Sequence, residues 1–422
     1  MMKRFVCLFI CLFICLSARA AEMANVEYIH QAIKQRWGIT VPYNPNLGNP
    51  RVAANMKYLL TVVDRANRIL SGYDVTSYGN DATYATQAAA DTTAVNEAVR
   101  RLIVRPFYLV TTPDTSVFSF EMSAAGTFVV DWGDGTQDTI TRTNTNLTKY
   151  SHNYAATGEY KIGFSGHATA YSTESARTNP TPAIQFKANE NVATIHGSIG
   201  VVFSTIDDGA QQWQQPMFHN LFRDCVNLTG AIPPELFKGV HGAPVERMFA
   251  SLFQSTNITG TIPEKLFADI RGAPQWAVFN NLFQNSTISG TIPPKLFAGI
   301  KGAPADYMFS NTFKWCSNLT GEIPAGLFSG ISGAPAQYMY NQIFYNSPGL
   351  TGQIPENLFG NITGDAAEYM FKESFFDCVG LTGPSARQNG RYLYEIWPNA
   401  GQGCYGNVTG LTDYADIPAA WK

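Results

Sequence analysis

Hydrophobic positions follow three successive patterns along the chain, and the first of them is helical. From Pro50 to Leu70 and again from Ala82 to Leu102, apolar residues recur at the three- and four-residue spacing of an amphipathic helix. Asn49-Pro50 is a typical helix start, and Ser71-Gly72 is a typical stop. The pattern predicts a helical region over residues 21–105, most simply a helical hairpin that serves as a spacer or an N-terminal cap.

The first twenty residues have the pattern of a secretory signal peptide. A basic start at Lys3 and Arg4 precedes an apolar run from Phe5 to Leu16, with small residues at Ala18 and Ala20. A membrane anchor is the alternative, but a membrane-spanning helix needs about 20 apolar residues. We therefore expect cleavage of residues 1–20, no transmembrane segment afterwards, and a secreted, extracellular or cell-surface protein.

Strand periodicity replaces the helical pattern between residues 106 and 175. The runs Val117–Met122, Thr127–Val130 and Tyr160–Phe164 are rich in aromatic and β-branched residues, and turn signals separate them. This alternation predicts a small antiparallel β-domain over residues 106–175.

A glycine- and aspartate-rich motif follows the second of these strands, and it consists of Asp131, Trp132, Gly133, Asp134 and Gly135. The glycines permit positive φ angles, the two carboxylates can accept hydrogen bonds from nearby amides, and the tryptophan suits a core position. The alternative is a calcium site, but calcium takes six to eight oxygen ligands and the motif supplies two carboxylates. A structural turn is therefore the favoured interpretation, and we expect no metal.

The same segment resembles the PKD-like domain of extracellular proteins. The resemblance rests on Trp132-Gly133-Asp134-Gly135-Thr136 and on the later His152-Asn153-Tyr154 with Gly158-Glu159-Tyr160. It implies an immunoglobulin-type β-sandwich over about 65 residues.

Internal repeats occupy the rest of the chain. A hydrophobic pair recurs at intervals of 31, 30, 30, 31 and 31 residues, at Met217-Phe218, Met248-Phe249, Val278-Phe279, Met308-Phe309, Met339-Tyr340 and Met370-Phe371. A second aromatic residue follows four positions after the pair's aromatic, and a Leu/Ile-Thr/Ser-Gly triplet comes next. Five of the six units continue as x-Ile-Pro-x-x-Leu-Phe. A unit of this length cannot bury its apolar face alone, so the repeats predict a stacked solenoid.

The repeats resemble leucine-rich repeats, in particular those of BspA-like bacterial surface proteins. The phrase Leu-Thr-Gly-x-Ile-Pro-x-x-Leu-Phe carries the likeness, although 30–31 residues exceed the usual repeat length. Degenerate units at 195–199 and 404–410 would cap the two ends, so the solenoid is placed over 183–422. The expected fold class is multidomain: a short α-helical N-terminal region, a PKD-like immunoglobulin-type β-sandwich, and a leucine-rich-repeat-like solenoid of about six repeats.

Two rows of equivalent residues make this arrangement testable. The isoleucines of the Ile-Pro phrase, Ile262, Ile292, Ile323 and Ile354, are predicted to point inward as an aliphatic ladder. The position eight residues after each repeat's first residue is filled by Cys225, Thr256, Ser286, Cys316, Ser347 and Cys378.

These cysteines are predicted to be buried and unpaired. Cys316 is two repeats from Cys378 and three from Cys225, and rungs about 4.7–4.9 Å apart place both pairs beyond disulfide reach. Cys378 with Cys404 is left as an open possibility.

Composition and charge exclude several classes of function. Charged residues make up 14% of the chain, and its 29 basic and 32 acidic residues give a net charge of −3. Loss of Lys3, Arg4 and Arg19 with the leader would leave 26 basic residues and a net charge of −6. That charge disfavours nucleic acid as a partner. We find no nucleophile motif, phosphate loop or metal-ligand spacing, so we expect no enzyme activity and no cofactor.

A binding function is the leading hypothesis. Aromatic residues at variable repeat positions are the candidate ligand-binding residues, because such side chains stack on sugars or fill pockets on a protein partner. They are Trp213, Trp276, Tyr307, Trp315, Tyr338, Tyr345 and Tyr369. The alternative for each is that it covers the core of its own repeat. The BspA resemblance implies bacterial adhesion to an extracellular protein or glycan. The competing hypothesis is a catalytic or non-catalytic component of extracellular polysaccharide or protein degradation, which PKD-like domains often accompany.

Overall fold

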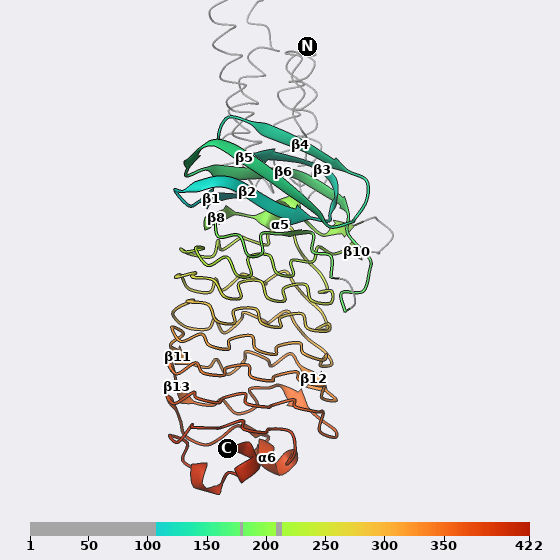
Figure 1. The fold of residues 1–422 in the computed structure, drawn as a ribbon. Helices are drawn as coiled ribbons and strands as arrows, with labels where there is room; N and C mark the ends of the chain where they lie inside the picture. Colours follow the sequence, from blue (N-terminus) through green and yellow to red (C-terminus); the bar gives the residue numbers. More distant parts are fainter. Residues whose placement is uncertain (1–106, 178–179, 208–212) are drawn as a thin grey trace, which may run out of the picture.

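The computed structural model describes residues 107–177, 180–207 and 213–422. In Figure 1 two antiparallel sheets lie at one end of an elongated molecule, and the repeats extend from them as a stack that ends at the C-terminus. The predicted signal peptide and the predicted helical region lie outside the described residues. Within the described residues, no helix is long and apolar enough to span a membrane.

The two sheets contain eight strands. The five-stranded sheet has the order β4-β3-β6-β1-β8, from β1 (Phe107–Thr111), β3 (Ala125–Asp131), β4 (Gln137–Arg142), β6 (Lys161–Ala170) and β8 (Val192–Gly197). The three-stranded sheet has the order β5-β2-β7, from β2 (Thr115–Met122), β5 (Thr148–Gly158) and β7 (Ile184–Gln185). All neighbouring strands in both sheets run antiparallel.

Aromatic side chains fill the space between the sheets. Phe120 on β2 meets Phe164 on β6 edge to face, with ring centroids 5.1 Å apart, and it also lies 6.1 Å from the ring of Trp132. Alternate residues of β2 are buried, as expected for a strand with one face on a core. The aromatic residues of the strand-like sequence runs therefore form this core.

The elements beyond the two sheets are short. The strands are β9 (Ile206–Asp207), β10 (Trp213–Gln214), β11 (Gly321–Glu322), β12 (Ser332–Gly333), β13 (Leu350–Gln353), β14 (Asn361–Ile362), β15 (Leu381–Thr382), β16 (Arg387–Gln388) and β17 (Arg391–Tyr392). The helices are α5 (Ile199–Val202), α6 (Leu393–Ile396) and two 3₁₀ turns, η1 (Tyr414–Asp416) and η2 (Ala419–Trp421).

The expected fold class is wrong. The described residues consist mostly of strands in several small sheets with few helices, rather than an immunoglobulin-type sandwich followed by a leucine-rich-repeat-like solenoid. Among the described residues, β-sheet pairing between repeats is limited to isolated bridges and parallel strands of two to four residues, as in β11-β13-β15 and β12-β14. The described residues therefore lack the long parallel sheet that leucine-rich repeats would build.

Consecutive tight turns take the place of that sheet. In the second repeat, the amides of Phe249, Ser251 and Phe253 donate to carbonyls of the next repeat at 2.8–3.0 Å. The amide between the first two, that of Ala250, instead bonds back to the carbonyl of Arg247 at 3.0 Å. Every fourth residue has a positive φ, such as 54° at Ser251 and 55° at Ser255. We call these segments (217–225, 248–256, 278–286, 308–316, 339–347 and 370–378) the turn segments.

The interior between turn segments and Ile-Pro phrases is a set of side-chain columns. Ile262, Ile292, Ile323 and Ile354 are all 2–4% exposed, which confirms that they face the core. Phenylalanines stack from one repeat to the next beside them: Phe253, Phe283 and Phe313 have successive ring centroids 5.8 and 5.9 Å apart. Each repeat therefore packs its apolar side chains on those of its neighbours.

Truncation of one ladder residue tests this packing. Ile292→Ala is expected to lower the free energy of unfolding by about 2–5 kcal/mol, because it removes buried methyl groups and leaves a cavity between two neighbouring repeats. Lys295→Ala, three residues away and exposed, is the matched control and should change stability little. Denaturant unfolding of both variants measures the difference, and equal stabilities would place Ile292 outside the core.

The cysteine row behaves as predicted. Cys225, Cys316 and Cys378 are buried and unpaired, and Thr256, Ser286 and Ser347 occupy the same buried row. The three thiols donate to carbonyls of the preceding rung at 2.9–3.1 Å, and burial raises their pKa to about 12. They are therefore inert small side chains.

The open question of a Cys378–Cys404 bridge is also settled. Both thiols are free and buried. The amide of Phe375 donates to the carbonyl of Cys404 at 2.9 Å, and the ring of Phe375 stacks on that of Tyr405. Cys404 therefore stands next to Ser374 in the adjacent rung, not next to Cys378.

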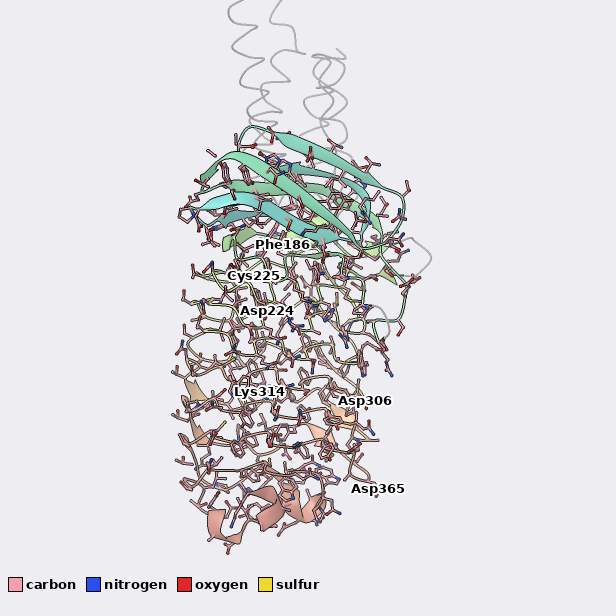
Figure 2. The ribbon with its side chains drawn as sticks, viewed as in Figure 1. Phe186, Asp224, Cys225, Asp306, Lys314 and Asp365 are labelled. Atoms are coloured by element: carbon pink, nitrogen blue, oxygen red, sulfur yellow. The ribbon has the colours of Figure 1, made fainter. Side chains whose placement is uncertain are left out.

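Both ends of the stack are covered. At the N-terminal end, residues 183–197 belong to the two sheets and to the stack: β7 and β8 pair with β2 and β1, while the amide of Phe186 donates to the carbonyl of Leu221 at 2.7 Å. The ring of Phe186, which Figure 2 labels where the sheets meet the repeats, stacks on that of Phe222 with ring centroids 5.6 Å apart. At the other end, the fully buried Trp421 covers Tyr405, with ring centroids 6.0 Å apart.

Candidate binding surface

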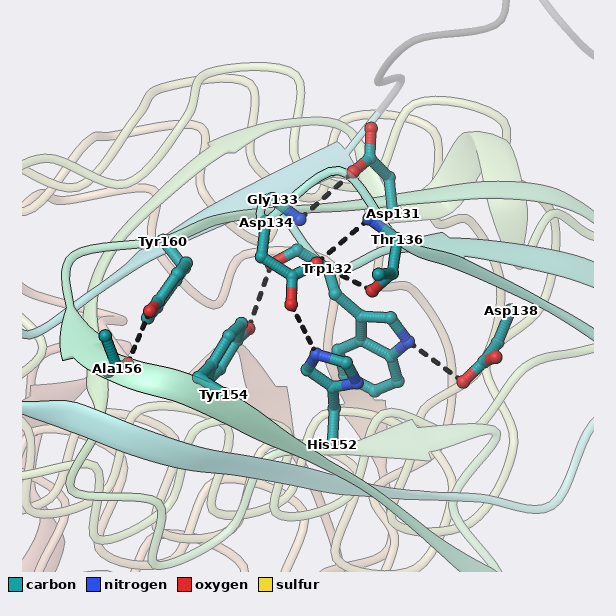
Figure 3. A network of polar contacts seen from close by, with 10 residues as sticks. All are labelled: Asp131, Trp132, Gly133, Asp134, Thr136, Asp138, His152, Tyr154, Ala156 and Tyr160. Atoms are coloured by element: carbon teal, nitrogen blue, oxygen red, sulfur yellow. Dashed lines mark hydrogen bonds and ion pairs between the residues drawn. The ribbon is translucent and has the colours of Figure 1, made fainter.

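The glycine- and aspartate-rich motif forms a hydrogen-bonded turn (Figure 3). Asp131 Oδ1 accepts from the amide of Gly133 at 3.0 Å, and Asp134 Oδ1 accepts from the amide of Thr136 at 2.9 Å. Gly133 has a φ of 83°, and a Cβ at this position would lie 2.7 Å from the carbonyl oxygen of Lys161. These contacts hold the backbone of the turn in place.

The remaining polar groups of the motif bind to one another. Trp132 is 1% exposed and donates from Nε1 to Asp138 Oδ2 at 2.9 Å, while Tyr154 donates to the carbonyl of Trp132 at 2.9 Å. His152 stacks on Trp132 at 4.7 Å, and its Nε2 lies 2.8 Å from Asp134 Oδ2. Across the described ranges, no cluster of three or more His, Cys, Asp or Glu side chains could hold a metal ion. The buried Trp132 thus anchors the turn in the core between the sheets.

This network should make stability depend on acid pH. Desolvation opposes the effect, but hydrogen bonds from Thr136 and His152 lower the pKa of Asp134 from 3.8 to about 2. A pKa lower in the folded state than in the unfolded chain stabilises the fold above about pH 4, and that stabilisation is lost as pH falls from about 4 to about 2. The gap in melting temperature between the native protein and Asp134→Asn should therefore shrink over this interval. A gap that stays constant would contradict the assignment.

Four of the candidate aromatic residues assemble into one column. Trp276, Tyr307, Tyr338 and Tyr369 come from successive repeats, with ring centroids 6.2, 4.6 and 5.1 Å apart. All four are half-buried, and the rings of Tyr307 and Tyr338 are nearly parallel, with an interplanar angle of 7°. We call this set the tyrosine column.

Two more candidates form a second column with a residue that the sequence analysis missed. Trp315 meets Tyr345 edge to face at 6.2 Å, and Tyr345 stacks on Phe376 at 4.9 Å. Lys314 places its Nζ 4.6 Å from the ring of Trp315 and 4.9 Å from that of Tyr345. We call Trp315, Tyr345 and Phe376 the tryptophan column.

Both columns lie on the outward side of the turn segments. Along residues 307–316, positions 307, 311, 314 and 315 are at least partly exposed, and the positions between them are buried. Tyr307, Asn311 and Trp315 also have positive φ angles of 56–58°, so the four-residue turn period directs this row of side chains outward. We call the outward side of the turn segments the turn face.

Polar side chains also lie on the turn face. Lys314 Nζ donates to Gln342 Oε1 at 2.6 Å, and Gln342 Nε2 donates in turn to Glu373 Oε2. Lys372 places its Nζ 5.2 Å from the ring of Tyr369. The turn face therefore combines polar and charged side chains with the two aromatic columns.

The tyrosine hydroxyls on this face are hydrogen-bond donors. Partial desolvation and the negative charges of Asp306 and Glu368 raise the pKa of Tyr307, and desolvation with Glu368 does the same for Tyr338. Neither hydroxyl bonds to another residue within the described ranges. Since the rings of Tyr307 and Tyr338 stack on each other, the faces that they share are covered, and a ligand on this face would meet their edges and hydroxyl groups.

The sequence identified the aromatic residues but not their neighbours. None of the six candidates that can be placed is buried in the core, and Trp315 is 43% exposed. The side chain of the seventh, Trp213, lies outside what the structure describes. Phe376 was missed because it directly follows the core residue Phe375, although it occupies the same repeat position as Tyr345. No family model, curated protein or solved structure matches the chain.

Proposed function

We propose that this chain is a secreted or cell-surface bacterial binding protein, without enzyme activity, that recognises an extracellular glycan or protein through its turn face. The observation that carries the proposal is the assembly of Trp276, Tyr307, Tyr338 and Tyr369 into one partly exposed column. Core positions repeat almost unchanged from unit to unit, whereas the position of these tyrosines holds Arg247 and Ala277 in two earlier units. Variation over a constant scaffold is expected where side chains serve recognition rather than folding.

Two features of the sequence support the location and the class. The signal-peptide pattern indicates export, and the resemblance to BspA-like and PKD-containing proteins is a resemblance to extracellular binding proteins. A part in extracellular polysaccharide or protein degradation is the second candidate, supported by the same PKD resemblance. The two candidates differ in whether a bound ligand is turned over.

A binding screen with the mature chain separates them. The secreted protein is incubated with a panel of glycans and extracellular proteins, and both retained ligand and reaction products are measured. We expect saturable binding with no turnover. Turnover of any ligand would favour the degradative role instead.

Two surface variants then locate the binding site. Trp315→Ala removes the exposed ring of the tryptophan column, and a Tyr307→Phe, Tyr338→Phe, Tyr369→Phe triple variant removes hydroxyls but keeps the stacked rings. Each should weaken binding about tenfold or more. Lys265→Ala and Lys295→Ala, on exposed positions of the Ile-Pro phrases, are the matched controls and should bind normally. Loss of binding in the controls alone would move the site away from the turn face.

A further inference from the structure

Positive charge gathers where the tyrosine column ends nearest the two sheets. The guanidinium carbon of Arg247 lies 4.7 Å from the ring centroid of Trp276, and that of Arg177 lies 5.2 Å from the same ring. Arg247 occupies the repeat position that Tyr307 and Tyr338 occupy in later units, so it continues the tyrosine column. Arg177 comes from the segment after β6 and reaches this place from outside the repeats.

Positive charges outnumber carboxylates in this cluster. Arg177 pairs with Glu246 at 2.9 Å, and Arg223 pairs with Asp224 at 3.1 Å. Arg247 has no carboxylate within 4.0 Å among the described residues, and burial lowers its pKa although the charge of Glu246 opposes that shift. An unpaired, partly buried guanidinium is costly unless it has a partner in some state of the protein.

A buried histidine lies beside these positive charges. His219 is 6% exposed and lies 3.4 Å from Arg247, measured from Nε2 to Nη1. Burial and the charges of Arg247, Arg223 and Lys187 lower its pKa to about 3, so the ring is neutral. In a mature chain whose net charge is about −6, this part of the turn face attracts anions.

The rest of the turn face favours a sugar over a protein as the carrier of that anion. Protein partners are usually held by apolar anchors in buried pockets. Of the five large apolar side chains that are exposed in the described residues, only Trp315 lies on this face. The face offers tyrosine hydroxyls, amides and ring edges, which are the groups that hydrogen-bond and pack against hydroxylated rings.

We propose that Arg177 and Arg247 bind a carboxylate of an acidic glycan, whose chain continues along the tyrosine column. This rests on the proposed function and assigns its ligand class. Guanidinium groups bind carboxylates through two parallel hydrogen bonds, which gives the contact direction as well as strength. Asp306 and Glu368 near Tyr307 and Tyr338 oppose negative charge farther along, so the carboxylate is bound at the arginine end.

Polygalacturonate and its fully methyl-esterified form are suitable probes, because they share the same sugar chain and differ only at the carboxyl group, which is charged in the first and a neutral ester in the second. Titration calorimetry with the mature chain should show binding of the acid form that is at least about tenfold tighter than binding of the ester. Arg247→Gln and Arg177→Gln should each remove most of that difference. Lys265→Gln and Lys295→Gln remove the same charge from another side and should not.

A gain of affinity is expected from Glu246→Gln. The carboxylate of Glu246 forms an ion pair with Arg177. Removing its charge makes that guanidinium available to the ligand, so polygalacturonate should bind several-fold tighter. A variant that fails to fold cannot bind more tightly, so this result is independent of stability. Unchanged or weaker binding in a folded Glu246→Gln variant would count against the assignment.

The other outcomes separate this inference from the function on which it rests. Equal binding of acid and ester, with loss in the tyrosine variant, would overturn the carboxylate site and leave the turn face as a binding surface. Equal binding of polyglutamate would overturn the glycan class. Binding of a glycan or protein that none of the turn-face variants affects would overturn both proposals.

Discussion

Deletion of residues 278–307 is expected to give a folded protein of lower stability. The deletion joins Ala277 to Met308 and removes one whole unit. The amides of Phe249, Ser251 and Phe253 now bond to carbonyls of residues 278, 280 and 282, and after the deletion they would face the equivalent carbonyls of 308, 310 and 312. Likewise Phe253 would stack on Phe313 in place of Phe283. Each remaining contact keeps an equivalent partner, so the loss is about one unit and one interface.

Deletion of half a unit should be far more damaging. Removal of residues 278–292 joins Ala277 to Pro293, so the turn segment 278–286 and Ile292 are lost while the rest of the unit, from Pro293 onward, remains. No later residue can then take up the hydrogen bonds or the core positions of the lost segment. Thermal unfolding by circular dichroism compares the two deletions. A half-unit deletion that melts at or above the temperature of the whole-unit deletion would contradict the interlocked arrangement of the repeats.

The repeat positions could be predicted because burial acts on each of them in the same way. A residue type that returns every 30 or 31 positions must meet the same surroundings each time, so the isoleucine ladder and the unpaired cysteines follow from spacing alone. The last unit does not keep the repeat spacing, because the segment that contains α6 precedes Cys404. The spacing therefore did not show which residue of the preceding repeat lies next to Cys404.

The backbone between those positions could not be predicted in the same way. The order of apolar and polar residues in stretches such as 308–316 does not follow a regular period. The turns also require positive φ at Tyr307 and Trp315, and bulky residues rarely adopt that conformation. Asn281, Asn285, Asn311 and Asn346 are the signal that was available, since asparagine tolerates this conformation better than most residues.

The candidate site was predictable in its aromatic residues and not in its charges. Variable repeat positions identified the rings, because they stand out against a constant core. Arg177 reaches Trp276 from about 100 residues earlier in the chain, and only the packing of the sheets on the first repeats brings the two together. Sequence spacing contains no information on that contact.

The C-terminal tryptophan should be the most sensitive single position in the stack. Trp421 is fully buried, donates from Nε1 to the carbonyl of Pro398 at 2.7 Å and covers the ring of Tyr405. Its carbonyl also accepts from the amide of Tyr405 at 2.8 Å, so it closes both the core and the backbone at this end. Trp421→Ala is expected to cost about 3–5 kcal/mol of unfolding free energy.

Trp315→Ala is the matched control, because it removes the same side chain from an exposed place on the same stack. It should cost less than about 1 kcal/mol. Denaturant unfolding gives both values, and Trp421→Phe should recover part of the loss because an aromatic ring would again cover Tyr405. The open end of Trp421→Ala would also expose unpaired backbone groups and aromatic surface, so light scattering should show association that the Trp315 variant lacks. Equal losses in the two tryptophan variants would mean that the last rung does not depend on its cap.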